Sequence, residues 1–242
     1  MKRVLITGVH KGLGLGLART YLANGWAVWG ISRNPPESIM DHPDFHFFKR
    51  DLRQLDNLDV YAHELSEKAQ GFDMVYLNAG MLGTIQQFEK TAYPEIRNIM
   101  DLNVWANKML LDGLLRATTP PGQIIAISSG AAKNGSCGWG PYSVSKAALD
   151  MLIRVVSNET PGVHMCALAP GLVGTDMLDT ILNAPPRPQF EADCTLRRAQ
   201  AEGNIQTPDT VARLLYRIAP RLLSVESGTH QDVRELPFDI LP

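Results

Sequence analysis

Short runs of apolar residues alternate along the chain with longer stretches in which apolar positions repeat at a helical period. The short runs predict β-strands, and alternation of strands with helices is typical of a parallel sheet covered by helices on both faces. No internal repeat, low-complexity tract or linker divides the chain. We therefore predict a single α/β domain over residues 1–242 with a doubly wound parallel sheet. The predicted strands are 3–6, 27–31, 46–48, 74–77, 124–127 and 164–168.

Residues 176–203 depart from this pattern. They lie between the sixth predicted strand and a later helix, and Pro185, Pro186 and Pro188 exclude a continuous helix. An ordinary surface loop is one interpretation. We favour a substrate lid at about 176–203, because long segments in this position often close over a binding site.

A glycine-rich turn follows the first predicted strand and leads into a helix that runs to about residue 25. Gly8 permits a tight turn, while Gly12 and Gly14 leave room for a pyrophosphate or for close packing of the helix on the sheet. A turn without a ligand is the alternative, but the order strand, turn, helix is the context in which this motif binds a dinucleotide. The same turn also contributes His10, Lys11 and Leu13 to the predicted cofactor site.

Tyr142 and Lys146 lie four residues apart at the start of a predicted helix, so they share one helix face. A tyrosine hydroxyl titrates near about 10 in water, and a neighbouring cation favours its phenolate. Ser128 and Ser129 follow the strand 124–127, at the sheet edge where ligands bind in open parallel sheets. Surface tyrosines and lysines are common, so this pair indicates a catalytic site only together with the glycine turn.

These features resemble the short-chain dehydrogenase/reductase family, and the resemblance covers nearly the whole chain. It implies a Rossmann-type sheet and a nicotinamide cofactor. One departure is Leu77, where many members carry a second asparagine before Asn78. The family's motifs correspond here to Thr7, Gly8, Gly12, Gly14, Asn78, Ala79, Gly80, Asn103, Ser129, Tyr142, Lys146, Pro170, Gly171 and Thr175, and Val173 lies within the last of these motifs.

The chemistry of ketone reduction assigns roles to four of these residues. Hydride addition to a carbonyl requires an acid within hydrogen-bond reach of the oxygen, and Tyr142 is the predicted acid. Ser129 would hold the carbonyl oxygen. Ser128 is a rival for this role, but the thirteen-residue spacing to Tyr142 matches the family's serine at Ser129, and we expect Ser128 to face the structure. By resemblance, Lys146 lowers the tyrosine pKa and binds the nicotinamide ribose, and Asn103 completes a proton relay through its backbone and a water.

The charge after the second strand indicates which cofactor is bound. Where a carboxylate would bind the ribose of NAD, this chain has Ser32 and then Arg33, which suits a 2′-phosphate. Lys11 supplies a second positive charge nearby, so we predict NADP(H). Asp51, followed by Leu52, resembles the family's adenine contact; a helix cap is the alternative for Asp51, because the sequence from Arg53 onward looks helical.

A closer resemblance, to the sepiapterin reductase and benzil reductase branch, spans 127–151, 169–177 and 227–232. It implies reduction of a vicinal diketone or of a pterin side-chain carbonyl. Trp139 would form an apolar wall beside Tyr142, and a buried core tryptophan is the alternative. Asp232 falls where sepiapterin reductase anchors the pterin ring; a turn or an ion pair with Arg234 is the alternative.

Composition narrows the partners to small molecules. With 23 basic and 25 acidic residues among 242, the chain has no charge excess that would favour nucleic acid or a membrane surface. The apolar run after Met1 is interrupted at Thr7, so we expect no signal peptide and no membrane span. Three cysteines without metal-ligand spacing favour reduced thiols, a cytoplasmic enzyme and no metal site.

The helix that holds Tyr142 and Lys146 continues to Val156 and has more apolar residues than packing of one helix face against the sheet requires. With the family's habit of pairing through this helix and the helix at 101–115, we expect a homodimer and allow for a tetramer. Other functions remain open: alcohol dehydrogenation in a biosynthetic pathway, a cofactor-sensing regulator, or a signalling protein of the same fold. Intact Ser129, Tyr142 and Lys146 argue against the regulator, and turnover of a diketone with NADPH would separate a signalling protein from an enzyme.

Overall fold

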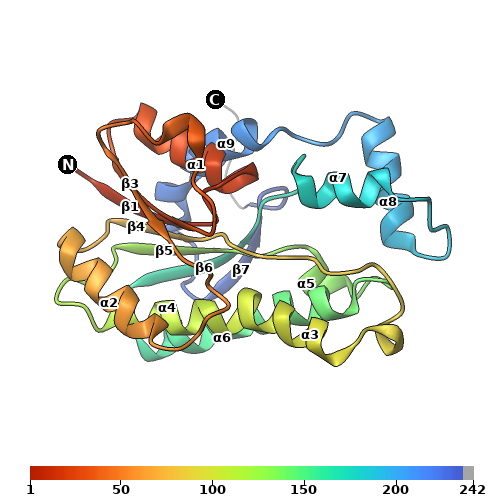
Figure 1. Ribbon diagram of the computed structural model, residues 1–242, viewed down its shortest axis with the longest axis horizontal. Helices are drawn as coiled ribbons and strands as arrows, with labels where there is room; N and C mark the ends of the chain where they lie inside the picture. The colour runs from red at the N-terminus through yellow and green to blue at the C-terminus, as the bar shows by residue number, and fades with distance from the viewer. Residues whose placement is uncertain (237–242) are drawn as a thin grey trace.

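The computed structural model describes residues 1–236, and these form one seven-stranded parallel sheet with helices on both faces (Figure 1). The strand order is β3-β2-β1-β4-β5-β6-β7, and every adjacent pair is parallel. The predicted single α/β domain and its first six strands are confirmed. The strands are β1 (Arg3–Thr7), β2 (Ala27–Ser32), β3 (Phe45–Lys49), β4 (Met74–Leu77), β5 (Gln123–Ile127), β6 (His164–Ala169) and β7 (Thr229–Asp232).

Two groups of helices cover the sheet, as the two sides of the ribbon in Figure 1 show. One face packs against α1 and α9, and the other against α2, α4 and α6. A π-helical segment, Asp101–Trp105, precedes α4. The helices are α1 (Gly12–Ala23), α2 (Leu58–Ala69), α3 (Tyr93–Met100), α4 (Ala106–Leu115), α5 (Ala131–Asn134), α6 (Gly140–Glu159), α7 (Asp176–Asn183), α8 (Glu191–Ala201) and α9 (Pro208–Leu222), and single 3₁₀ turns lie at Glu37–Ile39 and Phe88–Lys90.

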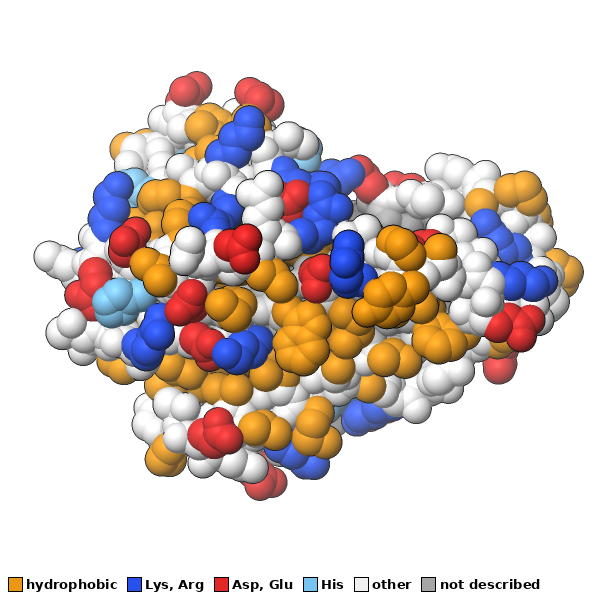
Figure 2. Space-filling view, turned by 60° about the horizontal axis from the view of Figure 1, so that its bottom comes forward, with side chains coloured by type: hydrophobic (Ala, Val, Ile, Leu, Met, Phe, Trp, Pro, Cys, Tyr) orange, Lys and Arg blue, Asp and Glu red, His pale blue; other side chains and the backbone are white. Residues whose placement is uncertain are grey.

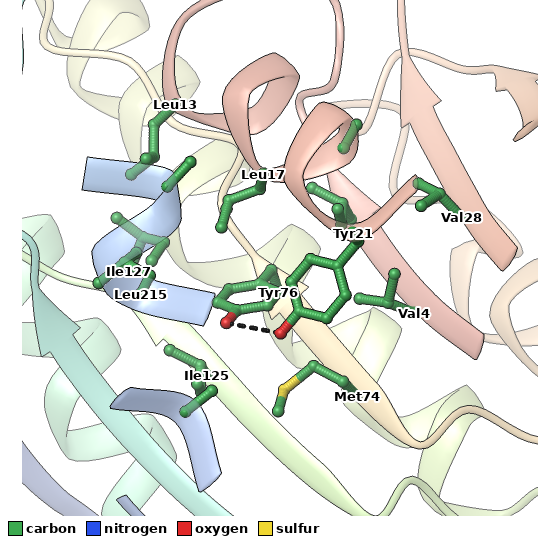
Figure 3. Packing of buried hydrophobic residues seen from close by; sticks show 14 of the residues in the cluster. Val4, Leu13, Leu17, Tyr21, Val28, Met74, Tyr76, Ile125, Ile127 and Leu215 are labelled. Atoms are coloured by element: carbon green, nitrogen blue, oxygen red, sulfur yellow. Dashed lines mark hydrogen bonds between the residues drawn. The ribbon is translucent and has the colours of Figure 1, made fainter. Parts of the chain in front are cut away.

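The core follows from the alternation of side chains along each strand. In β1, Val4 and Ile6 face the cluster under α1 and α9, whereas Leu5 faces the cluster under α2 and α4. Figure 3 shows the first cluster, in which Tyr21 and Tyr76 point their hydroxyls toward each other at 3.0 Å. Each of these buried hydroxyls therefore has a hydrogen-bond partner.

The sheet order places a crevice above the carboxyl ends of the strands. The strand order reverses at β1, because β2 and β3 add to one side of it while β4 and the later strands add to the other. Ligands of open α/β sheets bind at this kind of switch point. The turn after β1 and the loop after β4 meet there, where the side chain of Thr7 accepts hydrogen bonds from the backbone N–H groups of Asn78 and Ala79, both at 2.9 Å.

Two expectations about local structure need correction. The chain is not helical from Arg53 onward: α2 begins only at Leu58, so Asp51 caps no helix. Residues 176–203 do not form a loop either, because α7 and α8 occupy most of the segment and its three prolines lie in the connection between them. These helices pack over the crevice in a hydrophobic cluster of their own, centred on Leu178, Ile181 and Leu196.

Candidate active site

A cavity of about 430 Å³ extends along the crevice. One end lies at the glycine turn and the tips of β2 and β3, and the other lies beneath α7, beside the beginning of α6. It brings together nearly all the residues predicted from the sequence to bind cofactor or substrate. Those that line it are Gly8, His10, Lys11, Gly12, Leu13, Ser32, Arg33, Asp51, Leu52, Asn78, Ala79, Gly80, Ser129, Trp139, Tyr142, Lys146, Pro170, Gly171, Val173 and Thr175; Gly14, Asn103 and Asp232 do not.

Tyr142, Lys146 and Ser129 meet at the inner end of this cavity. Lys146 is only 4% exposed, its Nζ donates to the carbonyl of Ile127 at 2.7 Å, and it lies 5.7 Å from the centre of the Tyr142 ring. Ser129 lies beside Tyr142, close enough to lower the pKa of its hydroxyl. The strand end of β5 and the first turns of α6 thus place a phenol, an ammonium group and a hydroxyl around one space.

Burial dominates the titration of these groups. It raises the pKa of Tyr142, and the Ser129 side chain opposes that rise. Burial lowers the pKa of Lys146 to about 8, while the negative charge of Asp150 acts in the opposite direction. The sequence argument expected Lys146 to lower the tyrosine pKa. In the structure, burial and Ser129 set the pKa of Tyr142, and the ammonium group of Lys146 is directed to the Ile127 carbonyl.

Asn103 lies behind this group, in the π-helical segment, and is fully buried. Its side-chain amide donates to the carbonyl of Met81 and to the hydroxyl of Ser145, and its Oδ1 accepts from the N–H of Met81, all at 2.9 Å. The amide therefore anchors the loop after β4 to α6. A side chain at Gly80 would come within 3.5 Å of both Asn103 and Lys146, so glycine keeps this corner of the cavity open.

The glycine turn shows why two of its positions lack side chains. Gly8 has a φ of +77°, which disfavours other residues, and a Cβ there would lie 3.0 Å from the side-chain nitrogen of Asn78. A Cβ at Gly14 would lie 2.1 Å from the carbonyl oxygen of Gly8. Gly14 therefore allows close packing within the turn, the second of the two roles expected for it. Helix α1 begins at Gly12 without a side-chain cap, so its first N–H groups remain available to an anion.

The opposite end of the cavity is basic. Arg33, Arg50 and Arg53 line it with Lys11, and Arg33 takes part in no ion pair among the described residues. Lys11 is paired with Asp176, which also lines the cavity. The sequence argument singled out Lys11 and Arg33 but missed Arg50 and Arg53, although both follow the third strand closely.

Asp51 holds a tight turn at this end. Its Oδ1 accepts from the N–H of Arg53 at 3.0 Å, and its Oδ2 pairs with the guanidinium of Arg53 at 2.6 Å. These bonds from Arg53, with Arg33 nearby, lower the pKa of Asp51. An aspartate that bonds to the backbone two residues later favours a turn, which is why the expected helix does not start here.

The inner end of the cavity is apolar. Trp139 is half buried and meets the ring of Tyr142 edge-on, with 6.0 Å between ring centres. It lines the cavity as predicted, and it also packs against the hydrophobic cluster of α7 and α8. The sequence did not predict the other apolar lining residues, which come from the loop after β4, the segment before α4, the turn after β6, and helices α7 and α8. They are Met81, Leu82, Leu102, Leu172, Met177, Leu178, Ile181 and Leu196.

Comparison with known proteins decides the family. The model of the short chain dehydrogenase family matches residues 2–185. The chain belongs to this family. This short-chain dehydrogenase is 28% identical over 248 residues to benzil reductase ((S)-benzoin forming) from Bacillus subtilis, covering 97% of this chain and 99% of that protein. It is 29% identical over 186 residues to NADPH-dependent pterin aldehyde reductase from Arabidopsis thaliana, covering 73% and 77%.

Solved structures show the same fold. A short chain dehydrogenase/reductase from Saccharomyces cerevisiae superposes with a TM-score of 0.83 at 21% identity, covering 97% of both chains. A short chain dehydrogenase from Shigella flexneri, solved in complex with NADP, gives 0.76 at 22% identity, also covering 97% of both chains. The predicted Rossmann-type sheet of the family and the likeness to the benzil reductase branch are thereby confirmed.

Asp232 is the predicted substrate residue that the structure places elsewhere. It ends β7 and is buried, but it does not line the cavity of this short-chain dehydrogenase. Both carboxylate oxygens bond to the Arg234 guanidinium, at 2.8 and 2.6 Å, and Oδ1 also accepts from the N–H of Arg234. Asp232 thus makes the ion pair with Arg234 that was the alternative to a pterin anchor, and its contact with a substrate stays a prediction.

Metal ligands, membrane-spanning helices and cysteines were further candidates among the described residues. Among residues 1–236, no group of three or more His, Cys, Asp or Glu side chains is arranged to hold a metal ion. Within the same range, no helix is both long and apolar enough to span a membrane. Cys137, Cys166 and Cys194 are all free cysteines.

Proposed function

We propose that this short-chain dehydrogenase uses NADPH to reduce an apolar ketone, with vicinal diketones as the favoured substrates. The observation that carries the proposal is that Ser129, Tyr142 and Lys146 meet at the apolar end of a cavity whose other end is basic and opens on a glycine turn. The activities named for the relatives from Bacillus subtilis and Arabidopsis thaliana support a carbonyl reductase.

The residues of the cavity fit a dinucleotide phosphate. The uncapped start of α1 offers N–H donors beside Gly12, and Gly8 lets the turn approach closely. Arg33, free of ion pairs with the described residues, supports a 2′-phosphate contact and hence NADPH over NADH. Asp51 and Leu52 would border the adenine end. The cofactor, when bound, supplies the hydride.

The protein's own groups manage the proton. Tyr142 donates its hydroxyl proton to the developing alkoxide, and Ser129 directs its O–H to the same oxygen, which stabilises the charge that forms there. Lys146 keeps a positive charge beside the phenol at neutral pH, since its pKa is about 8. The backbone carbonyl of Asn103 accepts a bond from the Asn107 side chain at 2.8 Å, and we propose that the same carbonyl holds a water of the relay.

Apolar walls favour an uncharged substrate. Apart from Lys146, the residues around Tyr142 at this end are hydroxyl-bearing or apolar, and Trp139 offers an aromatic face. With Asp232 engaged by Arg234, we propose a diketone with bulky apolar substituents rather than a pterin. The test is NADPH oxidation, followed by absorbance, across benzil, aliphatic diketones, pterin aldehydes and simple ketones. No turnover of any of these carbonyls would refute the proposal, and preference for the pterins would refute its substrate class.

We also propose a homodimer. Hydrophobic side chains gather on the face that comes forward in Figure 2, where α4 and α6 lie. Trp105, Val144, Met151 and Val155 are each about half exposed there. Such a continuous apolar surface on neighbouring helices suits a self-complementary interface.

The free cysteines agree with a cytoplasmic enzyme, which fractionation of the native cells would test.

A further inference from the structure

Three side chains outside the proposed catalytic group form a cluster behind Lys146. The hydroxyl of Ser128 donates to Oδ1 of Asp150 at 2.5 Å, and Nδ1 of His230 lies 2.7 Å from Oδ2 of the same carboxylate. Because a carboxylate only accepts, Nδ1 of His230 carries the hydrogen. The exposed fractions are 3% for Ser128 and 17% and 9% for the side chains of Asp150 and His230. Both oxygens of Asp150 are therefore held in a largely buried place.

The cluster joins the three elements that surround the reacting groups. Ser128 lies between Ile127, whose carbonyl accepts from Lys146, and Ser129. Asp150 lies one turn after Lys146 on α6, so the two side chains share a helix face. His230 comes from β7, where it is in register with Ala167 of β6. The end of β5, the catalytic helix and the edge strand are thus linked through one carboxylate.

The cluster also holds the negative charge of Asp150 one helical turn from the buried ammonium group of Lys146. Lys146 is almost fully buried, and Asp150 opposes the lowering of its pKa that burial causes. The other groups that face Lys146 are neutral: Tyr142 on α6, the hydroxyls at the end of β5, and Asn103 near Gly80. His230 in turn faces Asp150 and lies close to Asp232, whose pKa is lowered chiefly by Arg234 and slightly by His230.

We propose that Asp150, held by Ser128 and His230, is a positioning residue that keeps Lys146 charged and in place beside the Tyr142 ring. It touches neither substrate nor cofactor in this role, and acts through Lys146. The inference rests on the proposed reductase function, in which the charged form of Lys146 supports proton donation by Tyr142.

The decisive variant is Asp150→Asn, which keeps the shape of the side chain and removes its charge. We expect kcat/KM for benzil, measured at saturating NADPH, to fall at the alkaline side about one pH unit lower than in the unmodified protein. The reason is that an opposite charge typically shifts a neighbouring pKa, here that of Lys146, by about 1 to 3 units. Asp150→Glu should restore the alkaline limb with a lower kcat. Asp59→Asn, which removes a paired surface carboxylate on α2, should leave the profile unchanged.

An unshifted alkaline limb in folded Asp150→Asn would overturn the inference, as would equal losses at every pH. If that variant does not fold, Ser128→Ala tests the same cluster while keeping every charge: a several-fold lower kcat with unchanged KM for NADPH supports the inference, and an unchanged kcat overturns it. A nitrogen-15 NMR titration of Lys146 Nζ distinguishes failure of this inference from failure of the proposed function, because it measures the lysine pKa without turnover. The Lys146→Met variant assigns the signal. A lower lysine pKa in Asp150→Asn is expected there, and an equal one contradicts the inference.

Discussion

Replacing Lys146 by methionine removes a buried cation from α6 and should stabilise the protein while it inactivates the enzyme. Burial lowers the lysine pKa from 10.5 to about 8. A group with a depressed cationic pKa loses its proton in the folded state before it does so in the unfolded state. The folded state therefore bears the penalty of the buried charge below pH 8, and that penalty disappears as the pH rises from 8 to 10.5.

The magnitude follows from the size of the shift. A change of about 2.5 pKa units corresponds to about 3 kcal/mol at pH 7, falling to about 1.5 kcal/mol at pH 9.5. Methionine has no such penalty, but it loses the hydrogen bond from Nζ to the Ile127 carbonyl, a pH-independent loss of about 1 kcal/mol. We expect the variant to be about 2 kcal/mol more stable at pH 7, and this advantage to shrink by about 1.5 kcal/mol at pH 9.5.

Urea denaturation of both proteins without cofactor, at pH 7 and 9.5 and at one protein concentration, measures this difference. Exposed Lys133 provides the matched control, because Lys133→Met should change stability by the same small amount at both pH values. Turnover and NADPH affinity should both fall in Lys146→Met. A stability difference that does not depend on pH, or a variant less stable by more than about 1 kcal/mol at pH 7, would refute the reasoning.

Four other substitutions test the remaining assignments. Tyr142→Phe should lower turnover by about two to four orders of magnitude with nearly unchanged NADPH binding, and activity within a few-fold of the original would remove the tyrosine as acid. Arg33→Asp should reverse much of a preference for NADPH over NADH in kcat/KM. Equal use of both coenzymes by the unmodified enzyme would contradict the contact between Arg33 and the 2′-phosphate. Met151→Glu should shift sedimentation at micromolar concentration from dimer to monomer, whereas a monomeric unmodified protein would exclude the interface. Asp232→Asn should weaken the Arg234 pair, lower the melting temperature and affect diketones and pterins alike; a KM increase for pterins alone would restore its substrate role.

Much of the fold could be predicted from the sequence because its signals are local. Buried parallel strands appear as short apolar runs, and the run at 74–77 coincides with β4. The turn at Gly8 needs a residue that tolerates positive φ, and a strand and a helix flank it directly. Tyr142 and Lys146 share a face by helical geometry alone, so their spacing was enough to place them together.

Contacts between residues distant in the sequence were decided by the tertiary structure. Lys11 was expected to be available for a phosphate, but the folding of α7 over the crevice brings Asp176 to it.

The cluster of Ser128, Asp150 and His230 shows the physical reason most clearly. No spacing in the sequence relates position 230 to position 150, because their meeting depends on β7 adding to the sheet beside β6 and on the register of that pair. Side-chain direction in a strand alternates at every residue, so a shift of one position would turn His230 to the other face. The sequence by itself determined which catalytic and charged groups the site contains and which elements carry them. Sheet order, strand register and the packing of α7 and α8 determined which of these groups are paired and which remain free to react.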